Sequence, residues 1–392
     1  MQHRLIASLS LGHLVTDINQ GALPALLPFL ISEYHLSYTA AAFIIFASNI
    51  ASTVVQPVFG HLADRLSTPW LMPAGIVLAG VGLAGTGLVA DYSGVLVSVM
   101  VSGIGIAAFH PQGAQLVNRV AGEQKATAMS IFGVGGTLGF ATGPILVTAA
   151  LLHWGLKGSA ILVIPTGIMA GILAWQLSTA TVGRAGLESG QAPVSTGKPR
   201  DNWGPFARLT AAVVTRSILF YGLNTFVPLY WIHVLHRSKA SGALALTVFA
   251  LTSVIGTLLG GRLADRFGHT RIAAGGFCAL IPLIPALVEA TSEPAALAVL
   301  GLIGVALSTT YSPLIILGQK YLPSHIGLSS GVTLGLAVTI GGVATPLLGQ
   351  MADHHGLWAT LAVMGLVPIL STGLALTLPP PERVHTHPLS RA

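Results

Sequence analysis

The sequence predicts an all-α membrane protein with twelve transmembrane helices in two pseudo-symmetric halves of six. Hydrophobic residues make up 53% of its 392 residues and charged residues only 8%, whereas soluble domains carry roughly 25% charged residues. Apolar runs of the length that a membrane-spanning helix needs, about 20 residues, recur twelve times along the chain. The string that begins at Gly60 returns at Gly261, 201 residues later, which is about half the chain.

The apolar runs give the expected spans in order. In the first half they are residues 5–31, 38–63, 70–90, 94–117, 124–151 and 158–180, and in the second half 207–234, 240–264, 271–290, 295–318, 325–350 and 357–378. Glycine is abundant inside them, as at Gly75, Gly80 and Gly82. Because small residues let helices in lipid approach closely, we expect a tightly packed bundle.

One change in composition divides the chain. Residues 181–205 are rich in polar residues, Gly, Ser and Pro, and we interpret them as a cytoplasmic linker between an N-terminal half, 1–180, and a C-terminal half, 206–380. Pro379, Pro380 and Pro381 end the last helix, and we expect the tail, 381–392, to be disordered.

The basic residues are distributed unevenly over the predicted loops. With the N-terminus in the cytoplasm, the cytoplasmic segments hold most of the 18 Lys and Arg residues, and the opposite side holds only Lys157, Arg237 and Lys239. This bias predicts a multi-pass protein with both termini in the cytoplasm. The basic residues form no patch, so the net charge of +6 does not indicate nucleic-acid binding.

The internal repeat extends beyond the opening string. Pro111 is paired with Pro313 and Pro144 with Pro346, each 202 residues apart. The fourth span therefore corresponds to the tenth and the fifth to the eleventh. Two halves in the same orientation joined by a linker are the parallel-repeat arrangement of one large class of transporters.

Two motifs carry a resemblance to known families. Residues 60–66 and 261–268 resemble the loop signature Gly-x-Leu-Ala-Asp-Arg-x-Gly of the major facilitator superfamily, although Ser67 replaces the last glycine in the first copy. The stretch 103–113, together with His13 and Asp17 in the first span, resembles the bacterial fosmidomycin-resistance-type exporters. The resemblance implies a monomeric transporter of small molecules in the bacterial inner membrane, surrounded by lipid and coupled to protons.

The resemblance also implies a gate. Asp64 and Arg65 in the first copy, and Asp265 and Arg266 in the second, lie at the cytoplasmic ends of their spans. In the family each such Asp faces the N-terminus of a helix in the opposite half, which closes the cytoplasmic side. The alternative is that these charges only set the topology of the loops.

Three residues are candidates for carrying protons. His13 and Asp17 are four residues apart on the first span and therefore share one helix face, and His110 precedes Pro111 in the fourth span. An acid inside a membrane is costly and usually faces a cavity or a partner, and histidine titrates near neutral pH. His13 could instead be a structural residue that hydrogen-bonds across a helix interface, and His110 could be a hydrogen-bonded histidine at a structural kink.

Arg216 is the basic residue that lies inside an apolar run of the second half, where it could attract an anionic substrate or extend toward the cytoplasmic edge. Polar and aromatic residues in the first, fourth, seventh and tenth spans complete the candidate substrate site. Its members are Asp17, Gln20, His110, Gln112, Arg216, Tyr221, Asn224 and Tyr311.

Several other functions are not supported. Cys278 is the single cysteine, and the histidine pairs at the span edges lack clustered acids, so we expect no metal site and no cofactor. No arrangement of nucleophile and base is recognisable, so we expect no enzyme.

The sequence thus predicts a proton-coupled exporter, an antiporter, of small polar or anionic molecules such as fosmidomycin-like antibiotics. Gly139, Gly143 and Pro144 match part of the superfamily's antiporter signature, which favours export, but Leu96 replaces the fourth-span arginine of many proton-driven exporters. Two alternatives stay open: proton-coupled uptake of a small metabolite by symport, and a membrane ligand sensor that does not transport.

Overall fold

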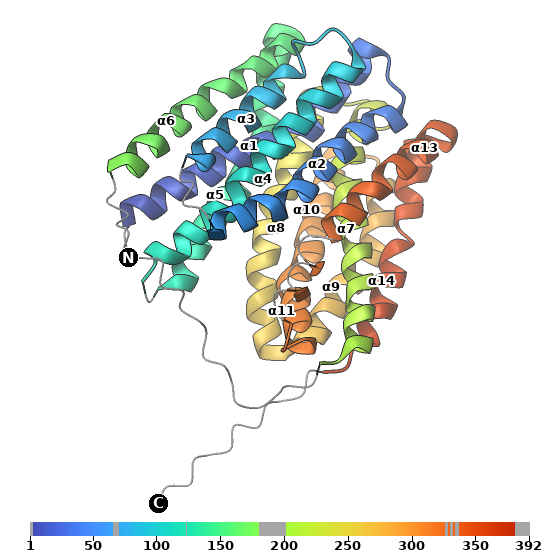
Figure 1. Cartoon of the computed structure of the whole chain (residues 1–392). Helices are drawn as coiled ribbons and strands as arrows, with labels where there is room; N and C mark the ends of the chain where they lie inside the picture. The colour runs from blue at the N-terminus through green and yellow to red at the C-terminus, as the bar shows by residue number, and fades with distance from the viewer. Residues whose placement is uncertain are drawn as a thin grey trace, which may run out of the picture.

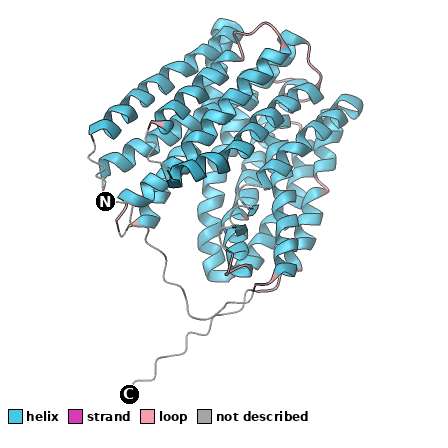
Figure 2. Ribbon diagram, viewed as in Figure 1, coloured by secondary structure: helices cyan, strands magenta, loops and turns pink. Residues whose placement is uncertain are grey.

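The computed structural model describes residues 3–65, 70–122, 124–179, 201–325, 328–329, 332–333 and 337–380. The side chains of residues 57, 60–65, 125–127, 179 and 337–339 are not described. Within the described residues the chain is helical with short connecting loops (Figure 2). Residues 181–200 of the predicted linker, 181–205, and the predicted tail lie outside the described residues, and α7 begins inside the predicted linker, at Trp203.

The N-terminal half contains six spans. They are α1 (His3–Tyr34), α2 (Tyr38–Arg65), α3 (Leu71–Gly85), α4 (Tyr92–Val120), α5 (Lys125–Trp154), and the 3-10 helix η1 (Gly155–Leu162) followed by α6 (Val163–Thr179). The C-terminal half contains α7 (Trp203–His233), α8 (Lys239–Phe267), α9 (His269–Val288), α10 (Glu293–Thr309), α11 (Tyr311–Tyr321), α13 (Ala337–Met364) and α14 (Val367–Leu376).

These helices confirm the predicted fold class. Nine of the described segments are long and apolar enough to cross a membrane, two of them with room for two crossings each, and the shorter apolar helix α3 supplies one more. The tenth span is broken at Thr310 into α10 and α11. In α13 the chain turns at Gly356, whose φ of 83° is a left-handed conformation that glycine adopts without strain.

Glycine brings α1 and α5 into direct backbone contact. A Cβ atom added at Gly21 of α1 would overlap the carbonyl oxygen of Phe140 in α5, and one added at Gly143 of α5 would overlap that of Ile18 in α1. Larger residues would force the two helices apart. The expectation of a tight bundle built on glycine therefore applies to the helices that carry the candidate site.

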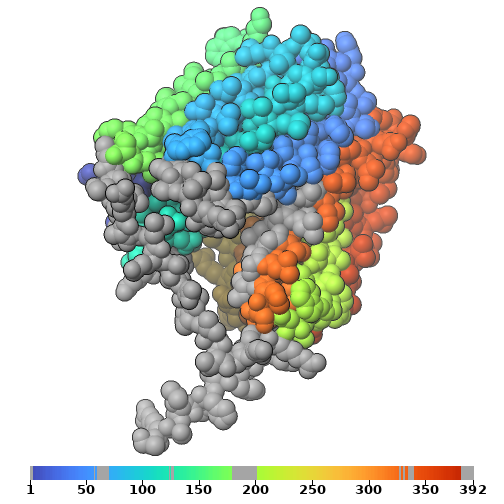
Figure 3. Space-filling model, in the orientation of Figure 1, coloured from blue at the N-terminus to red at the C-terminus, as the bar shows by residue number. Residues whose placement is uncertain are grey.

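The two halves meet at one end of the bundle. Helix α1 begins and helix α14 ends at the other end, which we call the termini end, and the halves diverge toward it (Figure 1). At the opposite end, the far end, α2 packs against α13, and α5 packs against α8. The hydroxyl of Thr247 in α8 donates a hydrogen bond of 2.8 Å to the carbonyl of Ala141 in α5. Figure 3 shows the same side in space-filling form, with the helices of the N-terminal half, blue to green, above those of the C-terminal half, yellow-green to red.

Candidate functional site

A cavity of about 340 Å³ lies between the two halves. The N-terminal half contributes polar side chains from α1, and the C-terminal half contributes polar side chains from α7 and the α10–α11 region. These residues are His13, Asp17 and Gln20 on one wall and Arg216, Tyr221 and Tyr311 on the other. Phe140, Phe220 and Phe249 add apolar surface, and the ring centroids of Phe140 and Phe220 are 6.1 Å apart across the boundary between the halves.

Asp17 lies between two histidines. Its Oδ1 is 3.0 Å from Nε2 of His110, and its Oδ2 is 3.3 Å from Nε2 of His13. Nδ1 of His13 is 2.8 Å from the carbonyl oxygen of Phe132 in α5. The three titratable side chains that the sequence selected as proton carriers are therefore one connected group, which we call the acid–histidine trio.

The contacts of the trio set the smallest number of protons that satisfies them. A carbonyl oxygen only accepts hydrogen bonds, so Nδ1 of His13 carries a hydrogen atom and donates it to Phe132. A neutral His110 with its hydrogen on Nε2 satisfies the contact with Asp17. The contact between His13 and Asp17 then needs one further proton, on either residue, because otherwise two lone pairs face each other. Beyond the hydrogen atoms of two neutral histidines, the trio therefore needs at least one proton for all its contacts to be satisfied.

Gly136 gives the trio its space. A Cβ atom at this position in α5 would lie 2.5 Å from Nε2 of His13 and 2.7 Å from Oδ2 of Asp17. Any other residue would therefore press on the two atoms of the contact between His13 and Asp17. The glycines of this region, which the sequence suggested for helix packing, also make room for the site.

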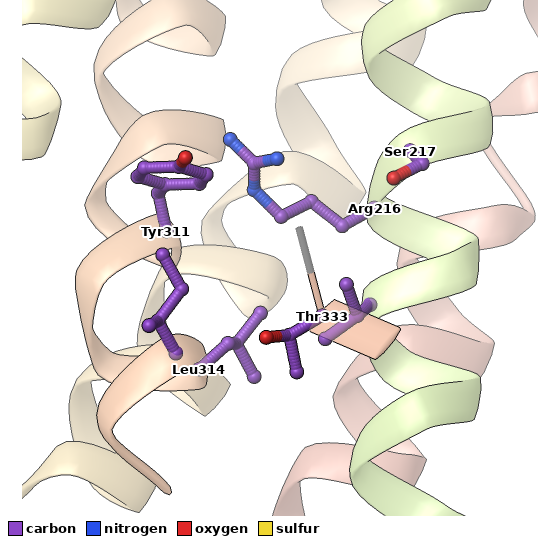
Figure 4. Close-up of a pocket in the computed structure, with 7 residues that line it drawn as sticks. Arg216, Ser217, Tyr311, Leu314 and Thr333 are labelled. Atoms are coloured by element: carbon purple, nitrogen blue, oxygen red, sulfur yellow. The ribbon is translucent and has the colours of Figure 1, made fainter. Parts of the chain in front are cut away.

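Arg216 forms the charged group of the opposite wall. Its Nε donates a hydrogen bond of 3.1 Å to the hydroxyl of Thr310, at the break between α10 and α11. Its guanidinium carbon lies 4.9 Å from the centre of the Tyr311 ring, as Figure 4 illustrates. None of the ion pairs among the described side chains includes Arg216. Its charge is thus held by a hydroxyl and an aromatic face, and no described acid neutralises it.

A smaller pocket of about 50 Å³ adjoins Arg216 (Figure 4). Ser217, Leu314 and Thr333 contribute to its walls. The pocket lies beside the side chain of Arg216.

The internal repeat places opposite charges on corresponding helices. Asp17 and His110 belong to the first and fourth spans, whereas Arg216 and Tyr311 belong to the seventh and tenth. Since the first span corresponds to the seventh and the fourth to the tenth, each half offers one charged group to the same cavity. The N-terminal group is acidic and the C-terminal group is basic.

Other predicted residues lie elsewhere. His110, Gln112 and Asn224 are outside the described lining of the cavity. Gln112 and Asn224 are buried, and the Nδ2 of Asn224 donates to the carbonyl of Phe220 at 2.8 Å. Asp265 is exposed, with its Oδ1 3.8 Å from Nε2 of His269. The gate that it would form with the fifth span stays a prediction.

For the other gating residues, Arg266 lies over the ring of Phe267, with its guanidinium carbon 5.2 Å from the ring centre. The side chains of Asp64 and Arg65 lie outside the described part of the chain.

Sequence reasoning missed three parts of the site. The carbonyl of Phe132 had no signal, because every residue carries one. Thr310 had a weak signal, since it lies three residues before Pro313, the counterpart of Pro111. Gly136 lies in the glycine-rich stretch of the fifth span, which predicted packing only.

Comparison with known proteins agrees with this architecture. The chain matches the model of the Major Facilitator Superfamily over residues 9–334. It is 29% identical over 394 residues to the uncharacterized MFS-type transporter YfnC of Bacillus subtilis (strain 168), with 97% of this chain and 94% of that protein covered. It is 27% identical over 385 residues to the fosmidomycin resistance protein of Escherichia coli (strain K12), with 96% and 92% covered.

Solved structures share the fold. A bacterial homologue of the human lysosomal transporter Spinster, in an inward-facing and occupied conformation, matches with a TM-score of 0.80 at 16% identity, covering 96% of each chain. The nucleoside transporter NupG matches with a TM-score of 0.73 at 13% identity, covering 96% of this chain and 99% of that one. With its family signature, its twelve spans and its central cavity, this chain belongs to the Major Facilitator Superfamily of membrane transporters.

Proposed function

We propose that this chain is a proton-coupled exporter of small polar or anionic molecules and works by alternating access between its two halves. The observation that carries this proposal is that His13 and Asp17 of the acid–histidine trio line the same cavity as Arg216, which no described acid neutralises. The similarity to a fosmidomycin resistance protein over almost the whole chain supports an antibiotic of that kind as a substrate.

We further propose that the termini end faces the cytoplasm of a bacterial cell. Arg4, Arg119, Arg208, Arg262 and Lys320 lie in helices toward that end, while Lys157, Arg237 and Lys239 lie at the far end. Positive residues favour the cytoplasmic side. In this orientation the described conformation is closed toward the outside and open toward the cytoplasm, the state that loads cargo for export. The monomeric state stays a prediction.

The transport cycle follows from the position of the proton. In the state open to the outside, a proton enters down its gradient and occupies the contact between His13 and Asp17. The substrate leaves as the proton binds. In the state open to the cytoplasm, the proton is released and substrate binds again. The trio and Arg216 provide the groups for this exchange.

Symport is a second candidate, and it is favoured by the presence of Arg216 in the same cavity as His13 and Asp17. An anion bound at Arg216 in the same cavity would attract the proton on the trio, since unlike charges stabilise each other strongly where water is scarce. An anion and a proton would then bind together and move in the same direction.

Transport measurements with the purified protein in liposomes test the proposal. We expect labelled fosmidomycin inside the liposomes to exchange with unlabelled compound outside, which a ligand sensor would not support. Adding substrate on one side should then move protons in the opposite direction. Exchange without proton movement would contradict proton coupling, and protons moving with the substrate would replace antiport by symport.

A further inference from the structure

We infer that the substrate is a dipolar molecule, with an oxyanion at one end that binds Arg216 and an N–H or O–H donor at the other end that binds Asp17 and His13. This inference rests on the proposed transport function and specifies its ligand class. It follows from what each wall of the cavity lacks.

The wall formed by the C-terminal half lacks an anion. Arg216 offers five N–H donors, of which Nε is bonded to Thr310. Arg216 is partly buried and lines the cavity, and an oxyanion that meets both its charge and its free donors stabilises such a guanidinium more than water does. Because no described acid is paired with it, a ligand oxyanion is the group that completes this wall, and the fork of the guanidinium suits a carboxylate, sulfonate or phosphonate.

The wall formed by the N-terminal half lacks a hydrogen-bond donor once the proton leaves. Phe132 fixes the hydrogen of His13 on Nδ1, so its Nε2 then presents a lone pair to Oδ2 of Asp17, only 3.3 Å away. Two acceptors at this distance repel each other. A donor group of the ligand that reaches both atoms takes the place of the proton, and an ammonium group also matches the charge of Asp17.

Both walls line the same cavity, and the size of this cavity suits such a ligand. Its volume of about 340 Å³ is at the lower end of the range of small-molecule sites. The rings of Phe140 and Phe220 offer apolar surface to the carbon chain between the two polar ends. The charged and titratable side chains that line the cavity, apart from His13 and Asp17, are Arg216, Tyr221 and Tyr311.

The donor end decides the direction of coupling. A ligand with a donor competes with the proton for the same two atoms, so its binding expels the proton, as antiport requires. An anion without a donor leaves the proton in place, and its charge holds the proton more firmly. The two modes of coupling described above are thus separated by one functional group of the ligand.

Matched probes test this inference on the purified full-length protein. The first set is a homologous series of aminoalkylsulfonates from ethyl to hexyl, and the matched sets are alkylsulfonates and alkylamines of the same lengths. Sulfonates stay ionised near neutral pH, and the matched alkylamines show how much proton release comes from the ammonium group of the probe, so any excess for an aminoalkylsulfonate comes from the protein. Binding is measured by calorimetry, and proton release by an indicator dye in weak buffer.

We expect at least one aminoalkylsulfonate to bind about tenfold or more tightly than both its alkylsulfonate and its alkylamine, the loss expected when a charged hydrogen bond is missing. Its binding should release about one proton per protein, and alkylsulfonate binding should release none. If no aminoalkylsulfonate binds more tightly than its matched alkylsulfonate, or if both release the same number of protons, the inference is wrong.

Variants assign the two ends. Asp17→Asn should remove the tighter binding of the aminoalkylsulfonate relative to the alkylsulfonate. Arg216→Gln should weaken the binding of both sulfonates. Glu33→Gln and Arg271→Gln are matched controls, because both side chains are exposed away from the cavity. An unchanged preference in Asp17→Asn would place the donor elsewhere and overturn the assignment.

Failure of this inference can be told apart from failure of the proposed function. If dipolar probes bind and release protons but are not exchanged across liposome membranes, the transport proposal fails and the ligand class stands. If donor-free anions are exported as efficiently as dipolar ones, transport stands and the ligand class fails.

Discussion

The carboxylate of Asp353 in α13 accepts hydrogen bonds from both the backbone N–H and the hydroxyl of Thr39 in α2, at 2.9 and 2.6 Å. It also accepts one from the N–H of Tyr38 at 2.7 Å. The first N–H groups of a helix have no partner within the helix and carry partial positive charge. An acid from the C-terminal half therefore caps a helix of the N-terminal half and joins the two halves at the far end.

We predict that Asp353→Asn weakens closure at the far end. Loss of a capping carboxylate costs about 1 kcal/mol at a site exposed to water, which is roughly a fivefold shift toward the state that is open at that end. Distance measurements between spin labels on the far-end loops of the two halves report this shift.

Thr39→Val is the matched comparison, because it removes the hydroxyl and keeps both N–H groups. We expect it to shift the distances less than Asp353→Asn does. Equal distance distributions in Asp353→Asn and in the unmodified protein would show that this contact does not hold the halves together.

We predict that Gly136→Ala impairs coupling more than folding. The added methyl group would press against His13 and Asp17 at the position of the exchangeable proton. Proton movement per substrate should fall by about tenfold, in line with a loss of roughly 1.4 kcal/mol, while the melting temperature changes little. Gly171→Ala in α6, where a Cβ atom meets nothing within 4 Å, should leave both unchanged. Normal coupling in Gly136→Ala would mean that the trio does not carry the proton.

The fold could be predicted from the sequence because its signals are long and repeated. A run of about 20 apolar residues is a spanning helix whatever its neighbours are, and the strings at Gly60 and Gly261 marked the duplication. The break at Thr310 was not predictable, because the apolar run continues through it. The contact of Asp353 with Thr39 was missed because it joins residues 314 positions apart.

The sequence predicted those site residues that differ in polarity or charge from the apolar span around them. An acid such as Asp17 inside an apolar span signals function by its cost alone, and its spacing from His13 places both on one face. The pairing with His110 depends on how α1 and α4 pack, which spacing along one helix does not report. Gln112 and Asn224 were selected for their polarity, but a polar side chain can also be buried between helices, away from the cavity, when it is hydrogen-bonded.

A pH-dependent contribution to stability is predicted at the termini end. The N–H of Ser324 and the ring of His325 lie 3.0 and 2.7 Å from the carboxylate oxygens of Asp201, just before α7. Desolvation alone would raise the pKa of Asp201, but these hydrogen bonds lower it below its ordinary value of 3.8. The contribution is therefore fully present above that value and is lost as the pH falls through the lower pKa of the folded protein.

Asp201→Asn should accordingly lower the melting temperature at neutral pH, and the difference from the unmodified protein should shrink as the pH falls below 3.8. Thermal unfolding across this pH range checks the effect. A difference that is constant or grows with acid would show that the charge of Asp201 plays no part.

The central claim is that one proton on the acid–histidine trio is exchanged for substrate. The most direct test measures proton movement driven by a fosmidomycin gradient in liposomes that contain either the unmodified protein or Asp17→Asn. We predict that the unmodified protein moves protons against the substrate, and that Asp17→Asn still exchanges labelled for unlabelled substrate but moves no protons. Proton movement by Asp17→Asn equal to that of the unmodified protein would contradict the claim.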